Sequence, residues 1–253
     1  MRKIAIVTGA TSGIGRATAI ALAEKGFNLI ITGRRADRLE ELKATLNTVY
    51  KADAMTLCFD VRNKQDVEEA FASVPEDWRQ IDVLVNNAGL AVGLDHIQEG
   101  NIDDWERMID TNVKGLLYVT RTVSPWMVER CKGHIVNLCS TAGKEVYANG
   151  NVYCATKHAV DALSKAMRID MLSYGIKVTN ICPGAVETEF SVVRFKGDKE
   201  RADKTYTGYT PLTGEDIANI ISFAVTVPDN VCLNDIVITP KAQANATNIF
   251  RKG

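Results

Sequence analysis

Short apolar runs alternate with stretches of helical pattern along almost the whole chain, and this alternation limits the possible folds more than any other feature. The first run, residues 4–8, is apolar at nearly every position and leads directly into a helical pattern over residues 13–25. A strand that is apolar at successive positions must be buried on both faces, which is typical of a parallel sheet covered by helices on each side. The sequence therefore predicts an α/β fold with one doubly wound parallel sheet.

The same pattern predicts seven strands and six helices without a linker or an internal repeat between them. The expected strands are residues 4–8, 29–32, 55–59, 81–86, 134–139, 177–182 and 236–239. The expected helices are residues 13–25, 38–46, 64–73, 103–130 with a bend at Pro125, 152–174 and 215–225. Residues 183–212 show no clear period and are expected to be irregular. We expect residues 1–253 to form a single domain.

Composition excludes several classes of function. The 253 residues have a net charge of -1 and 46% hydrophobic residues, so neither a nucleic-acid partner nor a disordered chain is expected. No apolar stretch approaches the roughly 18 residues of a membrane span, and the first apolar run is too short for a secretory signal. We expect a cytoplasmic protein whose six cysteines are reduced and mostly buried. No cysteine or histidine spacing indicates a metal site, and the three histidines are expected to be surface or structural groups.

A glycine-rich turn stands between the first strand and the first helix. It reads Thr-Gly-Ala-Thr-Ser-Gly-Ile-Gly over residues 8–15. Glycines allow the backbone to turn tightly and approach a ligand, and the amides at a helix start suit a pyrophosphate. A purely structural turn is the alternative for this motif taken alone. The candidate cofactor-binding residues here are Gly9, Thr11, Ser12, Gly13, Ile14 and Gly15.

Two arginines, Arg34 and Arg35, follow the second strand, where an NAD-dependent enzyme normally carries an acidic residue for the ribose hydroxyls. A carboxylate there would repel a 2′-phosphate, whereas guanidinium groups match phosphate geometry. This position favours NADP(H) over NAD(H). The alternative is a solvated arginine pair in a loop that enters a helix.

Two further loops that follow strands complete the predicted cofactor site. Asp60, next to Val61, is placed to accept a hydrogen bond from an adenine amino group, although a capping or turn role is the alternative. Asn86, Ala88 and Gly89 follow the fourth strand, where small residues allow the backbone to lie against a ribose.

Tyr153 and Lys157 lie four residues apart on one expected helix and therefore share a face. An ammonium group close to the phenol, together with an oxidised, cationic nicotinamide, would lower its pKa enough for general acid–base catalysis, although such a pair alone is more often packing plus a surface charge. Ser140 follows the fifth strand and is placed to hold a substrate oxygen beside the phenol. Asn112 lies inside the longest expected helix, where an asparagine is mildly unfavourable. One explanation is that Asn112 helps to hold a water molecule through which protons pass between Lys157 and solvent. The alternative is a solvent-facing or capping residue.

With these residues in place, the chain resembles the short-chain dehydrogenase/reductase family over nearly its whole length. The matching positions are 8–15, 86–89, 112, 140, 153, 157 and the run Pro-Gly-Ala-Val-Glu-Thr at 183–188. The resemblance implies a Rossmann-type fold and a catalytic tetrad of Asn112, Ser140, Tyr153 and Lys157. It also implies that Lys157 bonds the nicotinamide ribose, and that Pro183, Gly184, Val186 and Thr188 belong to the cofactor site, with Val186 and Thr188 holding the carboxamide. Members of the family are commonly homotetramers packed through two long helices, here 103–130 and 152–174.

Within that family, residues 32–42 and 189–198 look similar to the NADP-dependent 3-hydroxy acid dehydrogenases, which include serine and allo-threonine dehydrogenases. A short 3-hydroxy acid or its carbonyl counterpart is therefore the expected substrate, bound at Ser140, Tyr153 and Arg194. Arg194 would bind the substrate carboxylate, with Lys196 as a weaker candidate and a solvated basic loop as the alternative. Residues 183–212 are expected to act as a lid. The competing hypotheses are reduction of a keto-acyl, steroid or sugar carbonyl and, more remotely, a non-catalytic NADP-binding sensor or scaffold.

Overall fold

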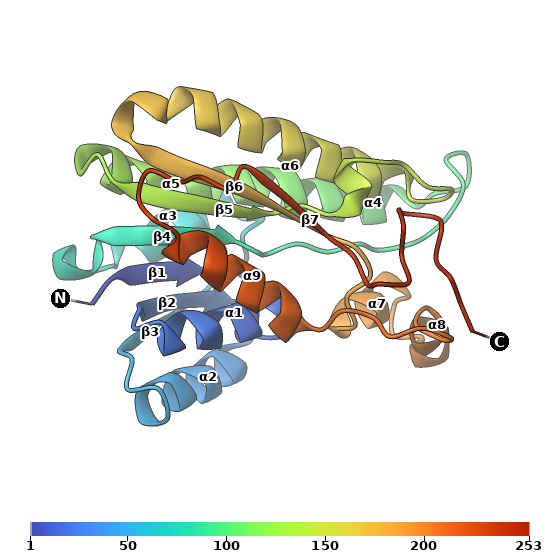
Figure 1. Ribbon diagram of the computed structural model, residues 1–253, viewed down its shortest axis with the longest axis horizontal. Helices are drawn as coiled ribbons and strands as arrows, with labels where there is room; N and C mark the ends of the chain where they lie inside the picture. Colours follow the sequence, from blue (N-terminus) through green and yellow to red (C-terminus); the bar gives the residue numbers. More distant parts are fainter. Residues whose placement is uncertain (1, 253) are drawn as a thin grey trace.

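A seven-stranded parallel sheet forms the centre of the computed structural model, which describes residues 2–252 (Figure 1). The strands run in the order β3-β2-β1-β4-β5-β6-β7, and every neighbouring pair is parallel. Their bounds are β1 Ile4–Val7, β2 Asn28–Gly33, β3 Ala54–Cys58, β4 Ile81–Asn86, β5 Gly133–Leu138, β6 Ile176–Pro183 and β7 Asp235–Ile238. The predicted fold class and all seven predicted strands are confirmed.

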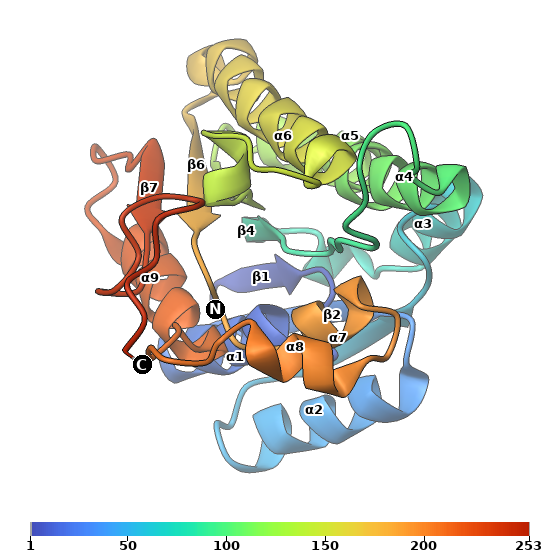
Figure 2. The same ribbon diagram turned by 90° about the vertical axis from the view of Figure 1, so that its right-hand side faces the viewer.

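Helices cover both faces of the sheet (Figures 1 and 2). One face carries α1 (Gly13–Glu24), α2 (Ala36–Thr48) and α9 (Gly214–Thr226), and the other carries α3 (Lys64–Ala72), α4 (Ile102–Ile109), α5 (Leu116–Glu129) and α6 (Asn151–Asp170). The first strand shows why an unbroken apolar run was required. Ile4 and Ile6 point into the core beneath one set of helices, and Ala5 and Val7 point into the core beneath the other.

The long helical region differs from the prediction in where it becomes irregular. Helix α5 continues through Pro125, and the departure from α-helix is a π-helical segment at Asp110–Gly115, labelled η2, between α4 and α5. Such segments widen a helix locally and often occur at functional sites. The long helical region is therefore divided by a π-helical segment that contains Asn112, a feature that the sequence pattern did not predict. The long helix expected at 152–174 ends at Asp170 and is followed by a short 3-10 helix, Leu172–Tyr174.

The prediction that residues 183–212 are irregular is wrong for two short pieces. Helices α7 (Glu189–Arg194) and α8 (Lys199–Lys204) lie beyond the end of the sheet (Figure 2). The side chain of Thr188 caps α7, and that of Asp198 caps α8. Helices of six residues are too short to show a periodic pattern in the sequence, so only their caps could have indicated them.

The cysteines are free, but they are not mostly buried as expected. Cys139, Cys154 and Cys182 are buried, whereas Cys58 and Cys131 are exposed because they lie at a strand end and a helix end. Within residues 2–252, none of the helices combines the length and the apolar character needed to cross a bilayer. The same part of the chain contains no cluster of three histidine, cysteine or acidic side chains arranged to hold a metal ion.

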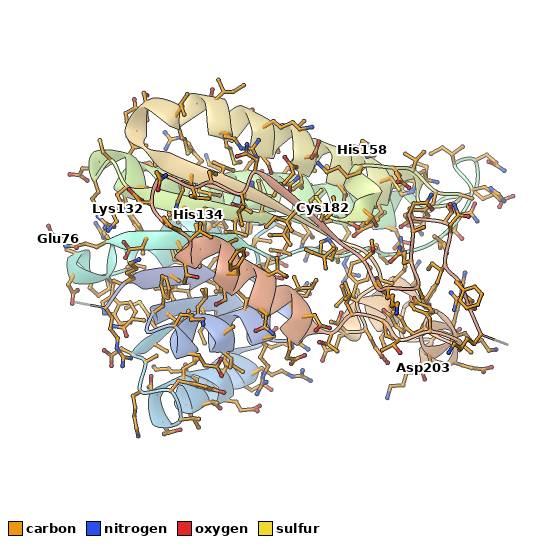
Figure 3. All side chains as sticks on the ribbon, in the orientation of Figure 1. Glu76, Lys132, His134, His158, Cys182 and Asp203 are labelled. Carbon is orange, nitrogen blue, oxygen red and sulfur yellow. The ribbon has the colours of Figure 1, made fainter. Side chains whose placement is uncertain are left out.

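The histidines are surface or structural groups, as predicted. His134 lies in β5, and its Nε2 shares a 2.7 Å hydrogen bond with the Thr179 hydroxyl (His134 and His158 are labelled in Figure 3). His96 and His158 are exposed. Burial, aided by the nearby Lys177 charge, lowers the pKa of His134 to about 4, so its imidazole is neutral at physiological pH.

Packing alone explains why residue 15, in the glycine-rich turn, is a glycine. A Cβ atom at this position would overlap the carbonyl oxygen of Gly9 and the side-chain amide of Asn87, which come from two different strand ends. The start of α1 can therefore approach β1 and β4 only if residue 15 has no side chain.

Replacement of Gly15 by alanine is expected to lower the free energy of unfolding by about 3 kcal/mol, because backbone rather than a flexible side chain must move. Gly26→Ala is the control, since its Cβ position has no atom of residues 2–252 within 4 Å apart from its own chain neighbours, and its positive φ of 84° is the unfavourable feature. That variant should lose about 1 kcal/mol. Urea unfolding of both proteins checks the difference, and equal losses would contradict the packing role of Gly15.

Candidate active site

A cavity of about 510 Å³ lies at the carboxyl ends of the strands, and residues of α7 form part of its lining. The strand order reverses between β1 and β4, which is the position where doubly wound sheets bind their ligands. The cavity brings together most of the predicted site residues: Gly9, Thr11, Ser12, Gly13, Ile14, Arg34, Arg35, Asp60, Val61, Ala88, Gly89, Ser140, Tyr153, Lys157, Pro183, Gly184, Val186, Thr188 and Arg194.

Three predicted site residues do not line this cavity. Gly15 is packed behind the glycine-rich turn, as described above. Asn86 is buried in the sheet, where its side-chain amide donates hydrogen bonds of 2.9 Å to Thr120 and to Asn137. Asn87, the next residue along the chain, lines the cavity instead. Asn112 is also buried, but it forms hydrogen bonds with the backbone of a loop rather than only with other side chains.

Hydrogen bonds of the Asn112 side chain connect the loop after β4 to η2 and α6. The side-chain oxygen of Asn112 accepts a 2.8 Å hydrogen bond from the backbone N–H of Leu90, and its amide donates to the Leu90 carbonyl at 2.8 Å and to the Thr156 hydroxyl at 3.0 Å. A solvent-facing or capping role for Asn112 is therefore wrong. Both N–H donors of the amide and one acceptor position of its oxygen are used by these contacts, so the side chain positions Leu90 and the neighbouring Gly89 beside Lys157.

Arg35 is held in place by the glycine-rich turn. Its Nη2 donates hydrogen bonds of 2.9 Å to the hydroxyls of Thr11 and Ser12, and its Nε donates to Thr11 at 3.1 Å. The remaining Nη1 contacts the carboxylate of Glu189 at 2.9 Å, and Arg38 reaches the other oxygen of the same carboxylate at 2.8 Å. Arg38 and Glu189 were missed by the sequence reasoning, although Arg38 lies only three residues beyond Arg35.

Arg34 and Asp60 form the outer edge of this part of the cavity. Their side chains lie 3.8 Å apart, and Asp60 makes a closer ion pair of 2.7 Å with Arg62. Partial burial raises the pKa of Asp60, but the hydrogen bonds and charge of Arg62 outweigh it, and the net pKa is below the ordinary value. Asp60 is thus ionised and an acceptor, and it also accepts the backbone N–H of Arg62, as the alternative turn role required.

The Ser140 hydroxyl lies between the end of β6 and the phenol of Tyr153. It donates to the carbonyl of Pro183 at 3.3 Å and accepts from the backbone N–H of Ala142 at 3.1 Å. Ser140 and Tyr153 both line the cavity, and the nearby serine hydroxyl acts to lower the pKa of Tyr153 against the larger, opposite effect of burial. The structure thus brings the two predicted residues to the same cavity, and the hydroxyl of Ser140 is bonded to the backbone at Pro183 and Ala142.

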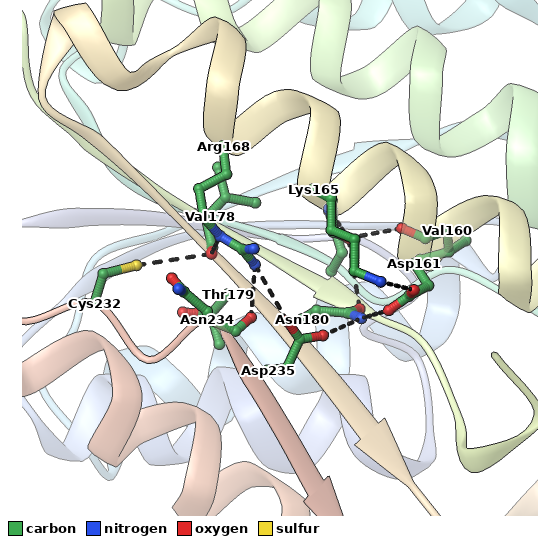
Figure 4. A network of polar contacts seen from close by, with 12 residues as sticks. Val160, Asp161, Lys165, Arg168, Val178, Thr179, Asn180, Cys232, Asn234 and Asp235 are labelled. Carbon is green, nitrogen blue, oxygen red and sulfur yellow. Dashed lines mark hydrogen bonds and ion pairs between the residues drawn. The ribbon is translucent and has the colours of Figure 1, made fainter. Parts of the chain in front are cut away.

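A charged network behind Ser140 ties its loop to α6 and β7. Lys144 pairs with Asp161, and it also pairs with Asp235 at 2.7 Å. Asp161 further accepts hydrogen bonds from Lys165 at 2.6 Å and Asn180 at 2.9 Å (Figure 4). These partly buried ion pairs anchor the loop that carries the serine.

Lys157 is buried, and its ammonium group donates a 2.8 Å hydrogen bond to the carbonyl of Leu138. Its nitrogen lies 5.9 Å from the centre of the Tyr153 ring and 3.5 Å from the position that a Cβ on Gly89 would take. Burial lowers the pKa of Lys157, while the neighbouring Cys139 and Cys182 act in the opposite direction. Tyr153 and Lys157 therefore share one face, as their spacing predicted.

Among the protein's own groups, Lys157 is not one of the main influences on the pKa of Tyr153. Burial raises the pKa of the phenol above its ordinary value, and the charge that most opposes this effect is that of Arg194. The guanidinium carbon of Arg194 lies 5.1 Å from the centre of the Tyr153 ring. The protein's own groups therefore keep Tyr153 protonated, which suits a proton donor.

Arg194 stands among aromatic rings at the wall of the cavity. Its guanidinium carbon lies 5.5 Å from the centre of the Tyr147 ring and 5.8 Å from that of Phe190, and it donates a hydrogen bond to the Tyr147 hydroxyl. Its buried Nε has no hydrogen-bond partner among the described residues. Tyr147 and Phe190 were not singled out in the sequence. Lys196, the weaker candidate, is instead paired with Asp104 at 2.7 Å and does not line the cavity.

A doubly wound sheet that brings a glycine-rich turn, a buried lysine, a serine and a tyrosine to one cavity is typical of the dinucleotide-dependent oxidoreductases as a class. Residues 3–199 match the model of the short chain dehydrogenase family, and the chain belongs to that family. The resemblance seen in the sequence is thus confirmed, and the chain is an enzyme of the dehydrogenase type.

Individual relatives cover almost the whole chain. The chain is 50% identical over 244 residues to an NADP-dependent 3-hydroxy acid dehydrogenase of Salmonella typhi, covering 96% of this chain and 97% of the relative. It is 42% identical to an NADP-dependent 3-hydroxy acid dehydrogenase of Schizosaccharomyces pombe, covering 99% and 97%. Among solved structures, the closed form of serine dehydrogenase complexed with NADP+ superimposes with a TM-score of 0.91 at 46% identity, covering 98% of this chain and 100% of that one.

Proposed function

We propose that this protein is an NADP(H)-dependent dehydrogenase that acts on C3 of a short 3-hydroxy acid, of the serine, allo-threonine or 3-hydroxypropionate type. The relatives described above support this proposal through their names, and they cover nearly the full length of the chain. The dependence on NADP rather than NAD is further supported by Arg35 and Arg38, two guanidinium groups at the point where the 2′-phosphate is recognised in this fold.

The position of Arg194 is the main structural support for a substrate that carries a carboxylate. A 3-hydroxy acid has its carboxylate two carbons away from the reacting carbon, so a cation is required a few ångströms from the phenol. The guanidinium of Arg194 is 5.1 Å from the ring centre of Tyr153 and has a buried Nε without a partner in the described chain. A planar guanidinium is suited to bind a carboxylate through two hydrogen bonds.

The other site residues receive roles that follow from their contacts. When bound, NADP(H) supplies or accepts the hydride. Tyr153 gives a proton to the substrate oxygen during reduction and takes it back during oxidation, while Ser140 holds that oxygen by a hydrogen bond. Lys157 holds the nicotinamide ribose by its ammonium group. Asn112 positions the Leu90 loop against which the cofactor lies.

The glycine-rich turn, Asp60, Val61, Ala88 and the run 183–188 would hold the rest of the dinucleotide, as expected from the sequence. We infer that residues 183–212 act as a lid, because α7 contributes Phe190 and Arg194 to the cavity wall and carries Glu189 across to α2.

A homotetramer is also part of the proposal. Leu117 on α5, Ile169 on α6 and Leu172 just beyond α6 are exposed apolar side chains, with 38%, 75% and 74% of their surfaces accessible. Subunits packed through α5 and α6 would remove these side chains from water, which favours association. Size-exclusion chromatography with light scattering tests the tetramer, and a monomer at micromolar concentration would refute it.

Replacement of Arg194 by alanine tests the substrate class. We expect kcat/KM for 3-hydroxypropionate to fall about 100-fold, because a charge-assisted pair with the carboxylate contributes about 3 kcal/mol. The uncharged amide, 3-hydroxypropionamide, should change by less than about fivefold, since it lacks that charge.

Lys196→Ala is the matched control, because Lys196 is a cation of the same segment that is paired with Asp104. It should leave the ratio of acid to amide turnover unchanged. Equal losses of the acid and the amide in Arg194→Ala would remove the proposed carboxylate contact, and oxidation of neither compound by the native protein would argue for a different carbonyl substrate.

A further inference from the structure

Glu189 connects the two sides of the cofactor cleft. It is the first residue of α7, on the side where the substrate is expected, and its two carboxylate oxygens contact Arg35 and Arg38 at 2.9 Å and 2.8 Å. Arg35 lies 154 residues away in the sequence, immediately before α2. The ion pair therefore joins the proposed lid to the part of the fold that binds the adenosine end of a dinucleotide.

The two arginines form one anion site rather than two separate surface charges. They lie three residues apart around the start of α2, so their guanidinium groups can converge. Thr11 and Ser12 hold Arg35 by three hydrogen bonds, which leaves its Nη1 directed toward Glu189. Side-chain burial is incomplete, with 38% of Arg35, 44% of Arg38 and 43% of Glu189 accessible, so a ligand from solvent can reach the site.

A phosphate monoester requires the same partners as this carboxylate. It carries a charge of about -1.5 to -2 at neutral pH and accepts hydrogen bonds through three oxygens. A phosphate that binds both arginines would meet the negative charge of Glu189 at close range, and like charges in one site repel each other. The carboxylate and the phosphate therefore exclude each other.

We propose that Glu189 acts as an internal substitute for the 2′-phosphate of NADP(H). Its carboxylate neutralises Arg35 and Arg38, the arriving 2′-phosphate displaces it, and α7 is thereby released from α2. Binding of the 2′-phosphate at the adenosine end of the cofactor cleft thereby changes the contacts of α7, the helix that contains Arg194. The inference rests on the proposed dependence on NADP(H), and it adds Glu189 as a determinant of how strongly the 2′-phosphate is bound.

Glu189→Gln tests this exchange with 2′,5′-ADP as the probe, since this compound has the 2′-phosphate but no nicotinamide. Isothermal titration calorimetry should give a Kd for 2′,5′-ADP that is about tenfold lower in the variant than in the native protein. The Kd for 5′-ADP, which lacks the 2′-phosphate, should change by less than twofold. Glu41→Gln is the matched control. It removes one negative charge close to Arg38 on α2, but Glu41 forms no ion pair within residues 2–252.

Hydrogen exchange gives a second readout. Binding of 2′,5′-ADP to the native protein should speed amide exchange in residues 189–204, and in Glu189→Gln the exchange should already be fast without the probe. A Kd for 2′,5′-ADP that is unchanged or higher in Glu189→Gln would overturn the proposal. If the native protein itself binds 2′,5′-ADP no better than 5′-ADP, the proposed NADP dependence fails instead, so the two failures are distinguishable.

Discussion

Replacement of Tyr153 by phenylalanine is expected to lower kcat for carbonyl reduction about a thousandfold while the Kd for NADPH changes by less than about twofold. The phenol is the group that gives a proton to the substrate oxygen, and loss of a positioned acid typically costs a factor of 100 to 10,000, to order of magnitude. The ring itself would remain, so its edge-to-face contact with Phe190, at 5.7 Å between centres, would be kept. Steady-state rates with NADPH and fluorescence titration of the cofactor measure the two quantities.

Tyr147→Phe is the matched control for this experiment. It removes a hydroxyl from a second tyrosine of the same cavity, one that accepts a hydrogen bond from Arg194 rather than contacting Ser140. Its main effect should be a higher KM for the acid, with kcat within about tenfold of the native value. If Tyr153→Phe keeps more than a tenth of the native kcat, Tyr153 is not the proton donor. A binding protein without turnover would show no difference between the two variants.

Replacement of Lys157 by methionine is expected to lower kcat/KM for the cofactor by about 1,000-fold, because the ammonium group is proposed to hold the nicotinamide ribose. Methionine has similar length and fills the same buried space, so the cavity walls should keep their packing. The loss should appear both in cofactor affinity and in turnover, which stopped-flow measurements of NADPH binding and of hydride transfer separate.

The stability of Lys157→Met gives an independent check. A buried ammonium is costly to the folded state, and here only the Leu138 carbonyl accepts a hydrogen bond from it among the described residues. Removing the charge offsets the lost hydrogen bond, so the free energy of unfolding should change by less than about 1 kcal/mol. Lys64→Met, at the first residue of α3 and 65% exposed, is the matched control and should leave cofactor kinetics unchanged. Unaltered kinetics in Lys157→Met would exclude the proposed role of Lys157.

The parts of the site that the sequence predicted are those set by local rules. The strand pattern places loops at the carboxyl ends of parallel strands, and those ends meet at one edge of the sheet. This is why the glycine-rich turn, Ser140 and Arg35 could be expected in one place although long stretches of chain separate them. Tyr153 and Lys157 required only a helix and a spacing of four.

The parts that could not be predicted depend on contacts between distant segments. Glu189 looked like any acidic residue until α7 placed it against Arg35 and Arg38. The direction of the pKa shift of Tyr153 was expected to follow from Lys157, but burial by surrounding segments outweighs any single neighbour. The sequence favoured Arg194 over Lys196 because of guanidinium chemistry, but only the tertiary structure paired Lys196 with Asp104 and placed Arg194 beside the phenol.

By itself the sequence determined the doubly wound sheet, the family and the set of chemical groups at the strand ends, because hydrophobic periodicity and glycine conformation act over a few residues. Only the tertiary structure decided which cation faces Tyr153, which acid meets Arg35, and how Asn112 is used. The physical reason is that electrostatic and desolvation effects depend on distance and burial in space, and segments far apart in the chain determine both.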